Sequence, residues 1–234
     1  MLAEIVTKSW YGVGMAISRP QTRQFEAFMT NLSYARRMVK AGAMLDPFRS
    51  PTIDIDDFYR AAWVQAVGAI DHWLHEEVLR RVAELAAKDS PEMPYQLRVY
   101  ELPLHRVEAV RRGEVTLSDA VVEHLREKLS GQALQHPGKI SEVLKLVTEK
   151  KVWYEAAGCI NKEFFQDRTT LNEKKLRSRY LEITQRRNKI AHDADLIDGD
   201  LEQRRPIDEA EVTDAIDWIE RIALAIARVL DSTG

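Results

Sequence analysis

The chain has 234 residues, 45% of them hydrophobic and 30% charged. This length is sufficient to bury a full core in one large domain. Its net charge of −3 excludes a protein that is basic over its whole surface, so any contact with nucleic acid has to come from a local patch. The single cysteine, Cys159, excludes an intramolecular disulfide bond and a cysteine-based zinc site.

The N-terminal part of the chain predicts two long helices. Apolar residues recur at steps of three and four over residues 21–43, the pattern of one amphipathic helix. A second helix is predicted from Asp54 or Asp56, as its N-cap, to about Lys88, and residues 58–74 are apolar on nearly every side. Such a helix is typical of the central rod of a bundle. Residues 1–20 are predicted to be irregular or to form a short helix, and residues 44–53 are predicted to form a loop.

The middle of the chain predicts a connection followed by three shorter helices. Residues 89–103 contain three prolines and are expected to form the connection. Thr116 or Ser118 is expected to cap the second helix, and Gly158 to end the third. The three predicted helices cover residues 104–112, 116–130 and 139–157. Residues 131–138 are predicted to form the loop between the last two.

The C-terminal part predicts two helices separated by an acidic loop. The first covers about 169–192 and has one apolar stripe. Asp208 and Glu211 have the spacing of a capping box and start the second helix, predicted over 208–231. No segment shows the alternation of a β-strand. We therefore expect an all-α fold, a bundle of four to five core helices in a single domain over 1–234.

Arg187 stands out on the helix predicted over 169–192. It falls on the apolar stripe, four residues after Ile183. A guanidinium in such a place is unfavourable unless it finds an anion, a partner or a water-filled cleft. Asn188 and His192 are four residues apart and share a different face. They therefore meet Arg187 only in a groove, at the end of the helix, or across a second subunit.

The same helix is locally basic. Between Glu173 and Lys189 it has seven basic residues against two acidic ones, a local charge of +5. A stripe of this kind is typical of contact with a nucleic-acid backbone, although such stripes are also common on solvated surfaces. The acidic loop that follows, residues 193–206, is an alternative partner. The candidate RNA-binding residues besides Arg187 are Lys174, Lys175, Arg177, Arg179, Arg186 and Lys189.

The string Arg187-Asn188-Lys189-Ile190-Ala191-His192 resembles the R-x4-H motif of the HEPN superfamily, in its RiboL-PSP-type branch or a close relative. The hydrophobic early helix, RAAWVQAVGAIDHWLHEEV, is similar to that branch as well. The resemblance covers about 55–230, with 89–165 as an inserted helical segment. It implies a HEPN-like helical bundle and a homodimeric endoribonuclease that uses no metal or other cofactor. It also implies a toxin or anti-phage effector, of the toxin–antitoxin or abortive-infection type. From the single cysteine, an N-terminal stretch without the apolar core of a signal peptide, and the lack of an apolar run of about 18 residues, we expect a cytoplasmic protein without membrane contact.

The chemistry follows from the residue types. RNA carries its own nucleophile, the 2′-hydroxyl, so His192 is expected to act as general base or acid and Arg187 to stabilise the charged phosphate. Asn188 is expected to orient His192 or to hold a phosphate oxygen. The products would be a 2′,3′-cyclic phosphate and a 5′-hydroxyl. One alternative is a non-catalytic HEPN module that binds RNA, a nucleotide or a partner protein such as an antitoxin. The other is a structural protein in which Arg187 pairs internally with Asp71 or another buried acid.

Other candidate residues lie outside the motif. Asp71 and His75 are four apart on the early helix, and Asp71 is a candidate to orient a catalytic side chain, the alternative being the solvent-facing end of a core helix. No Glu-x-x-His pair recurs, so no metal site is predicted. Trp153 and Tyr154 are weak candidates to stack on bases. The remaining aromatic candidates and the cysteine are expected in the core: Trp63, Trp73, Tyr180, Trp218 and Cys159.

Overall fold

The computed structural model describes residues 18–50, 54–88, 93–168 and 170–232, and these residues form an all-α fold. Extended backbone pairs at an isolated antiparallel bridge between Leu196 and Arg204. The helices, in chain order, are α1 (Arg23–Leu45), the 3₁₀-helix η1 (Asp46–Phe48), α2 (Asp56–Ala87), α3 (Tyr95–Arg98), α4 (Leu104–Arg111), α5 (Leu117–Leu129), α6 (Pro137–Leu144), α7 (Val152–Phe165), α8 (Glu173–His192) and α9 (Glu209–Asp231).

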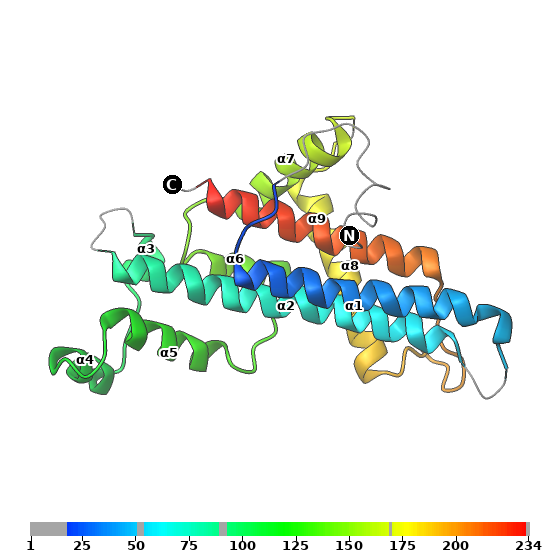
Figure 1. The fold of residues 1–234 in the computed structure, drawn as a ribbon, viewed down its shortest axis with the longest axis horizontal. Helices are drawn as coiled ribbons and strands as arrows, with labels where there is room; N and C mark the ends of the chain where they lie inside the picture. Colours follow the sequence, from blue (N-terminus) through cyan, green and yellow to red (C-terminus); the bar gives the residue numbers. More distant parts are fainter. Residues whose placement is uncertain (1–17, 51–53, 89–92, 169, 233–234) are drawn as a thin grey trace, which may run out of the picture.

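Helix α2 is the central rod, as its apolar sequence predicts. It packs against α1, α5, α6, α8 and α9. In Figure 1, the long helices α1, α2 and α9 lie side by side and α8 crosses them. Ile70 is 0% exposed and Trp73 is 1% exposed, and the Trp73 ring meets Phe25 edge-on with ring centroids 5.6 Å apart. A helix that is apolar on nearly every side can bury those sides only when other helices surround it.

Side-chain caps fix the starts of several helices. Asp208 Oδ1 accepts a hydrogen bond from Glu211 N at 2.8 Å, which confirms the predicted cap of α9. Thr116 caps α5, as one of its two predicted residues. The aspartate cap predicted for α2 is wrong. Ile55 is the N-cap there, because Asp54 turns its carboxylate onto the backbone N–H two residues later, at 3.1 Å.

The single helix predicted over 139–157 is wrong, because α6 and α7 are separate helices. Between them, the buried Thr148 hydroxyl accepts a hydrogen bond from the backbone N–H two residues later, at 3.2 Å, and so competes with helical pairing. Helix α6 starts earlier than predicted, with Pro137 in the first turn, where its missing N–H needs no partner. Gly158 lies inside α7, which ends instead at Phe165 and has Gln166, with φ of +50°, as its C-cap.

The segment 89–165 contains a peripheral arm and a part of the core. The arm consists of α3, α4 and α5 and packs on α2 through α5, whereas α7 packs against α8 and α9 (Figure 1). Helix α4 buries none of its side chains, and Arg106 ties it to α5 through Glu123 at 2.8 Å and Glu127 at 2.7 Å. Trp153 of α7 is 1% exposed. Helix α7 therefore belongs to the same core as the motif helix α8.

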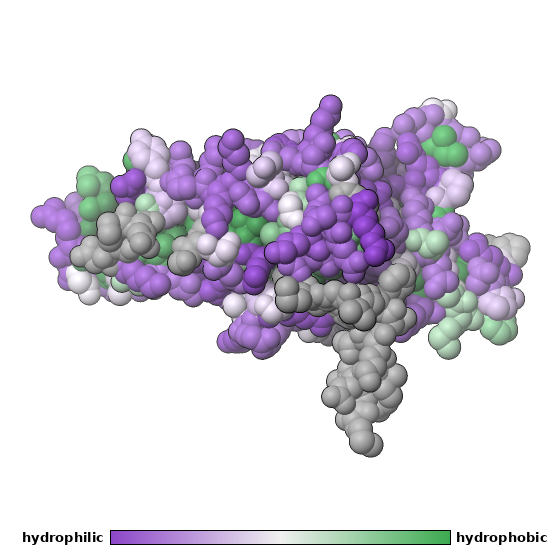
Figure 2. All heavy atoms as spheres, turned by 90° about the horizontal axis from the view of Figure 1, so that it is seen from above, coloured by the Kyte–Doolittle hydropathy of each residue, from purple (hydrophilic) through white to green (hydrophobic). Residues whose placement is uncertain are grey.

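The prediction for residues 1–17 lies outside the described residues, and 18–20 have no regular structure. Helix α8 begins later than predicted, after an Asn172 cap, so Leu171 precedes it. No helix in the described part of the chain is both long and apolar enough to cross a membrane. The face shown in Figure 2 is largely hydrophilic, with hydrophobic side chains gathered only in small separate areas.

Candidate functional site

Helix α8 carries the motif, and its inner face is fixed by burial. Asn172 caps the helix by accepting a hydrogen bond from a backbone N–H of the first turn at 2.9 Å. Tyr180 and Ile183 are fully buried, and the Trp63 indole N–H of α2 donates to the Ile183 carbonyl at 2.9 Å. Because Ile183 lies one turn before Arg187, this anchor sets the direction in which Arg187 leaves the helix.

Arg187 is half-buried and pairs with no carboxylate. Its Nη1 lies 3.1 Å from Asn188 Oδ1 and 3.5 Å from Gln135 Oε1, and both are neutral acceptors. Its Nε is buried without a hydrogen-bond partner, and no carboxylate of the described residues lies within 4.0 Å of the guanidinium. Arg187 therefore keeps an uncompensated charge in a place partly shielded from water. The alternative in which it pairs with Asp71 does not hold.

Asp71 instead holds a loop. Its Oδ1 accepts a hydrogen bond from Leu134 N at 2.6 Å, and the Tyr180 hydroxyl donates to the Leu134 carbonyl at 3.0 Å. The loop between α5 and α6 is thereby tied to both α2 and α8. Its next residue, Gln135, is 9% exposed and provides the amide oxygen that faces Arg187. Asp71 thus reaches the motif only through this loop, and it makes no direct hydrogen bond to a motif side chain.

His75 adds one contact to the same loop, through Gln132, and a second contact within α2, to Asp71. Its ring nitrogens Nδ1 and Nε2 lie 2.8 Å from the Asp71 carbonyl oxygen and 2.9 Å from the Gln132 carbonyl oxygen. With both nitrogens engaged, His75 serves the loop connection.

Burial, and then the charge of Asp71, raise the pKa of Tyr180, so the Tyr180 hydroxyl stays protonated and remains a donor to Leu134.

Asn188 and His192 are exposed on the outer side of α8. The Asn188 amide oxygen accepts from Arg187, so these two side chains meet within one chain. His192 is the last residue of α8, and its side chain makes no hydrogen bond or ion pair with another described residue. The structure thus brings Arg187 and Asn188 together. The predicted contact between Asn188 and His192 is not formed.

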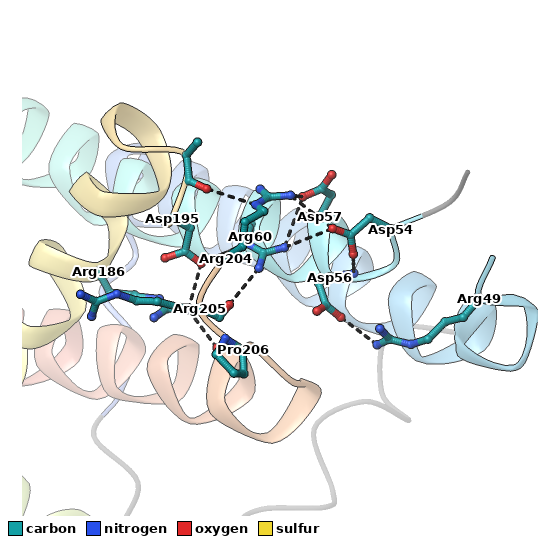
Figure 3. A network of polar contacts seen from close by, with 11 residues as sticks. Arg49, Asp54, Asp56, Asp57, Arg60, Arg186, Asp195, Arg204, Arg205 and Pro206 are labelled. Atoms are coloured by element: carbon teal, nitrogen blue, oxygen red, sulfur yellow. Dashed lines mark hydrogen bonds and ion pairs between the residues drawn. The ribbon is translucent and has the colours of Figure 1, made fainter. Parts of the chain in front are cut away.

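Directly after His192 the chain makes a turn that is anchored by a buried carboxylate (Figure 3). Asp195 is 0% exposed, and its Oδ2 accepts from Arg60 Nε at 3.0 Å and from Arg186 Nη2 at 2.9 Å. Ala194 and Asp195 have φ of +50° and +60°, a strained backbone for residues with a side chain. Two cationic partners, one from α2 and one from α8, hold the strained turn in place.

Two further aspartates of the acidic loop, Asp193 and Asp198, pair with basic residues around it. Lys189 Nζ lies 2.9 Å from Asp198 Oδ1 and 3.1 Å from Asp193 Oδ2, and Arg205 Nη2 lies 3.0 Å from Asp198 Oδ2. The hydrogen bond from Lys189, followed by its charge and that of Arg205, lowers the pKa of Asp198. Arg186 and Lys189 therefore pair with the acidic loop, which the sequence analysis gave as the alternative to nucleic acid.

The other candidate RNA-binding residues differ in their partners. Arg177 pairs with Glu173 at 3.0 Å, and Arg179 pairs with Glu182 and Asp214. Three of the seven basic residues of α8 have no carboxylate within 4.0 Å among the described residues: Lys174, Lys175 and Arg187. The charge left over for a phosphate thus lies at the two ends of the helix, two lysines at its start and one arginine at its end.

The aromatic candidates separate clearly. Trp153 is buried, and its indole N–H donates to the Pro137 carbonyl at 3.0 Å, so the prediction that it stacks on bases is wrong. Its neighbour Tyr154 is 62% exposed and remains available. Cys159 is partly buried against the core, and burial raises the pKa of its thiol. The aromatic residues expected in the core are packed in or against it: Trp63, Trp73, Tyr180 and Trp218.

Three residues that support the motif were not predicted from the sequence: Gln135, Asp195 and Arg60. Gln135 comes from a loop far from the motif in sequence, and no local pattern marks it. Asp195 is one of several aspartates in an acidic loop, and only the fold makes it the buried one. Arg60 did carry a signal, since it stands in the apolar stretch of α2 and, like Arg187, needed an explanation on that face.

Comparisons with protein-family models, with curated proteins and with solved structures find no match for this chain. Its function therefore has to be inferred from the side chains gathered around α8. Among them, Arg187 is the half-buried cation that has no carboxylate within 4.0 Å in the part of the chain that the structure describes.

Proposed function

We propose that this chain is a metal-independent HEPN endoribonuclease whose site lies at the C-terminal end of α8. The observation that carries the proposal is the charge of Arg187, which is half-buried and has no carboxylate partner among the described residues. A phosphate group matches the planar fork of a guanidinium and supplies the missing negative charge. His192 is exposed within about 8 Å along the helix axis, since five residues at 1.5 Å each separate the two positions.

The neighbouring Arg186 shows what a neutralised arginine looks like in the same helix. It donates to the buried Asp195 at 2.9 Å and to the Pro206 carbonyl at 3.0 Å. Its charge is used to hold the turn after α8. Arg187, one residue later, contacts only neutral acceptors. This difference makes Arg187, and not Arg186, the residue for a substrate anion.

In the proposed reaction the RNA supplies the nucleophile. The 2′-oxygen forms a bond to the adjacent phosphorus while the bond from phosphorus to the 5′-oxygen breaks, which gives a 2′,3′-cyclic phosphate and a 5′-hydroxyl. One proton leaves the 2′-hydroxyl and one is added to the leaving 5′-oxygen. His192 has an imidazole suited to either transfer near neutral pH. Arg187 stabilises the charge that grows on the phosphoryl oxygens, and Asn188 holds Arg187 in position.

Two proton transfers need two groups, and one chain offers one His192. The proposal therefore includes a homodimer in which two copies of the α8 end face one RNA strand. One imidazole would accept the proton from the 2′-hydroxyl and the other would donate to the leaving oxygen. A heterodimer of an active chain and a His192→Ala chain would then cut slowly. Its activity would lie far below half of the activity of the parent.

The test is RNA cleavage in EDTA by the purified parent protein and by Arg187→Ala and His192→Ala variants. We expect the parent to cut RNA and to leave 2′,3′-cyclic phosphate ends. Each variant should lose roughly 100-fold or more, and DNA of the same sequence should stay intact. Arg112→Ala is the matched control, because Arg112 is exposed and lies in the peripheral arm. Equal cutting by parent and variants, or no cutting under any condition, overturns the assignment.

Expression in cells tests the proposed role as a toxin or anti-phage effector. A nuclease of this kind should arrest growth, and the Arg187→Ala/His192→Ala variant should not. A partner protein acting as an antitoxin would relieve the arrest. If the parent binds RNA, a nucleotide or a partner protein but neither cuts RNA nor arrests growth, the non-catalytic HEPN module is the better description.

A further inference from the structure

A hollow of about 480 Å³ lies at the other end of α8, away from Arg187. It is lined by Tyr154, Asn172, Glu173, Lys174 and Arg177. Tyr154 is 62% exposed there, although it belongs to a helix that packs into the core. The hollow thus combines an open aromatic ring with two basic side chains.

The ring of Tyr154 is presented on a rigid support. The two residues before it, Val152 and Trp153, are 5% and 1% exposed, and the Trp153 indole donates to the Pro137 carbonyl at 3.0 Å. These contacts fix the first turn of α7 and leave Tyr154 on its outer side. A fixed and exposed aromatic face is the feature on which proteins stack unpaired bases.

The charges in the hollow favour a phosphate next to that base. Lys174 is exposed and has no carboxylate within 4.0 Å among the described residues. Arg177 pairs with Glu173 at 3.0 Å, across side chains that are 37% and 40% exposed. Exposed pairs of this kind contribute little, so a phosphate can share Arg177 at small cost. The three charged side chains leave a net positive charge in the hollow.

Helix geometry places the hollow on the same face of α8 as Asn188 and His192, the two exposed residues of the motif. Lys174 and His192 are eighteen residues apart, which is five full turns at 3.6 residues each, and Arg177 and Asn188 are about three turns apart. All four therefore point to the same side, and α8 is one continuous helix between them. The first pair is separated by about 27 Å, the length of about eight nucleotides stacked at 3.4 Å each.

We propose that this hollow is a binding subsite for single-stranded RNA, in which one base stacks on Tyr154 and a flanking phosphate contacts Lys174 and Arg177. The strand then follows the outer face of α8 toward Asn188 and His192. An unpaired strand is required, because a base in a duplex does not offer its face to a side chain. The inference rests on the proposed function, since it describes how the same RNA would be held away from the cut.

Binding is tested with the whole protein and a 12-nucleotide RNA whose 2′-hydroxyls are methylated, so that it cannot be cut by 2′-oxygen attack. Fluorescence anisotropy should show Tyr154→Ala weakening binding by roughly 5- to 100-fold, with Tyr154→Phe close to the parent. Lys174→Ala should lower the slope of log affinity against log salt by about 0.7, the value for one phosphate contact on a single strand. A duplex of the same sequence should bind equally to the parent and to Tyr154→Ala.

Tyr95→Ala is the matched control, since Tyr95 is 56% exposed and lies on the peripheral arm. If RNA binds the parent and Tyr154→Ala equally, the subsite is wrong, whether or not the protein cuts RNA. If Tyr154→Ala weakens binding but unmodified RNA is not cut, the subsite stands and the proposed nuclease activity fails. A parent protein that does not bind the methylated RNA overturns the subsite as well.

Discussion

The carboxylate of Asp71 accepts a 2.6 Å hydrogen bond from the backbone N–H of Leu134, and this bond ties the central helix α2 to the loop between α5 and α6. The same loop carries Gln135 to within 3.5 Å of Arg187. The motif is therefore supported from three directions: α8 itself, the loop held by Asp71, and the turn held by Asp195. Each support leads to a measurable expectation.

Replacing Asp71 with alanine should destabilise the fold through the loop. The change leaves the Leu134 N–H without its partner, and a lost hydrogen bond to a charged group of this kind contributes about 1–3 kcal/mol to the free energy of unfolding. Asp71→Asn should cost less, because its amide oxygen still accepts. Urea unfolding of the three proteins provides the comparison. A stability equal to the parent for Asp71→Ala would mean that Tyr180 and His75 hold the loop without Asp71.

Alanine substitution of the two adjacent arginines should affect different properties: stability for Arg186 and RNA cleavage for Arg187. Arg186→Ala removes one of two cations from the buried Asp195 and should lower the free energy of unfolding by about 1–3 kcal/mol. Arg187→Ala removes a cation that has no carboxylate partner among the described residues, and it should change stability by less than about 1 kcal/mol. RNA cleavage should show the larger loss for Arg187→Ala. Denaturant unfolding and cleavage rates for the same two variants give the comparison, and a reversed order in stability contradicts it.

The substitution Arg187→Lys should separate charge from geometry. Lysine keeps the positive charge but loses the planar fork that matches two phosphoryl oxygens. We expect RNA cleavage to fall by roughly tenfold or more, while the melting temperature stays close to that of the parent. Full activity of the lysine variant would show that a point charge is sufficient at this position. Arg112→Lys, on the exposed peripheral arm, serves as the control.

Asp195→Ala should be the most damaging single change in the loop. It leaves Arg60, with a side chain that is 5% exposed, and Arg186 without their shared carboxylate, and removing one partner of a buried ion pair costs about 3–5 kcal/mol. Asp193→Ala is the control, because Asp193 is 53% exposed and pairs with Lys189 on the surface. Thermal unfolding should separate the two variants clearly. Equal melting temperatures would contradict the role of Asp195 as the anchor.

The acidic loop should lose its contacts at low pH. Hydrogen bonds from Lys189 to Asp198, and from the backbone N–H groups of Glu202 and Gln203 to Asp200, lower the pKa of both carboxyls below the usual 3.8. Their contribution to stability is therefore fully present above pH 3.8 and is lost as the pH falls through the lowered pKa values. NMR titration of the two carboxyl carbons measures this. A midpoint at or above 3.8 for either one would contradict the hydrogen bonds.

The helices that the sequence predicted well are those whose pattern is local. The all-round apolar stretch of α2 and the capping aspartate of α9 depend on residues within a few turns of each other, so they could be identified without the fold. The break between α6 and α7 was missed, because Thr148 ends helical pairing through a buried hydroxyl contact. Its neighbours in sequence are ordinary helix formers, and no proline or glycine marks the break.

The sequence by itself determined that Arg187 is a charge on an apolar stripe, that Asn188 and His192 leave α8 on another face, and that α8 is basic. Those facts follow from helical periodicity and from residue types. The tertiary structure decided which charges remain available, because neutralisation depends on contacts between distant segments. In the folded chain Asp195 pairs with Arg60 and Arg186, and Asp198 pairs with Lys189. Arg187 contacts the neutral side chains of Gln135 and Asn188.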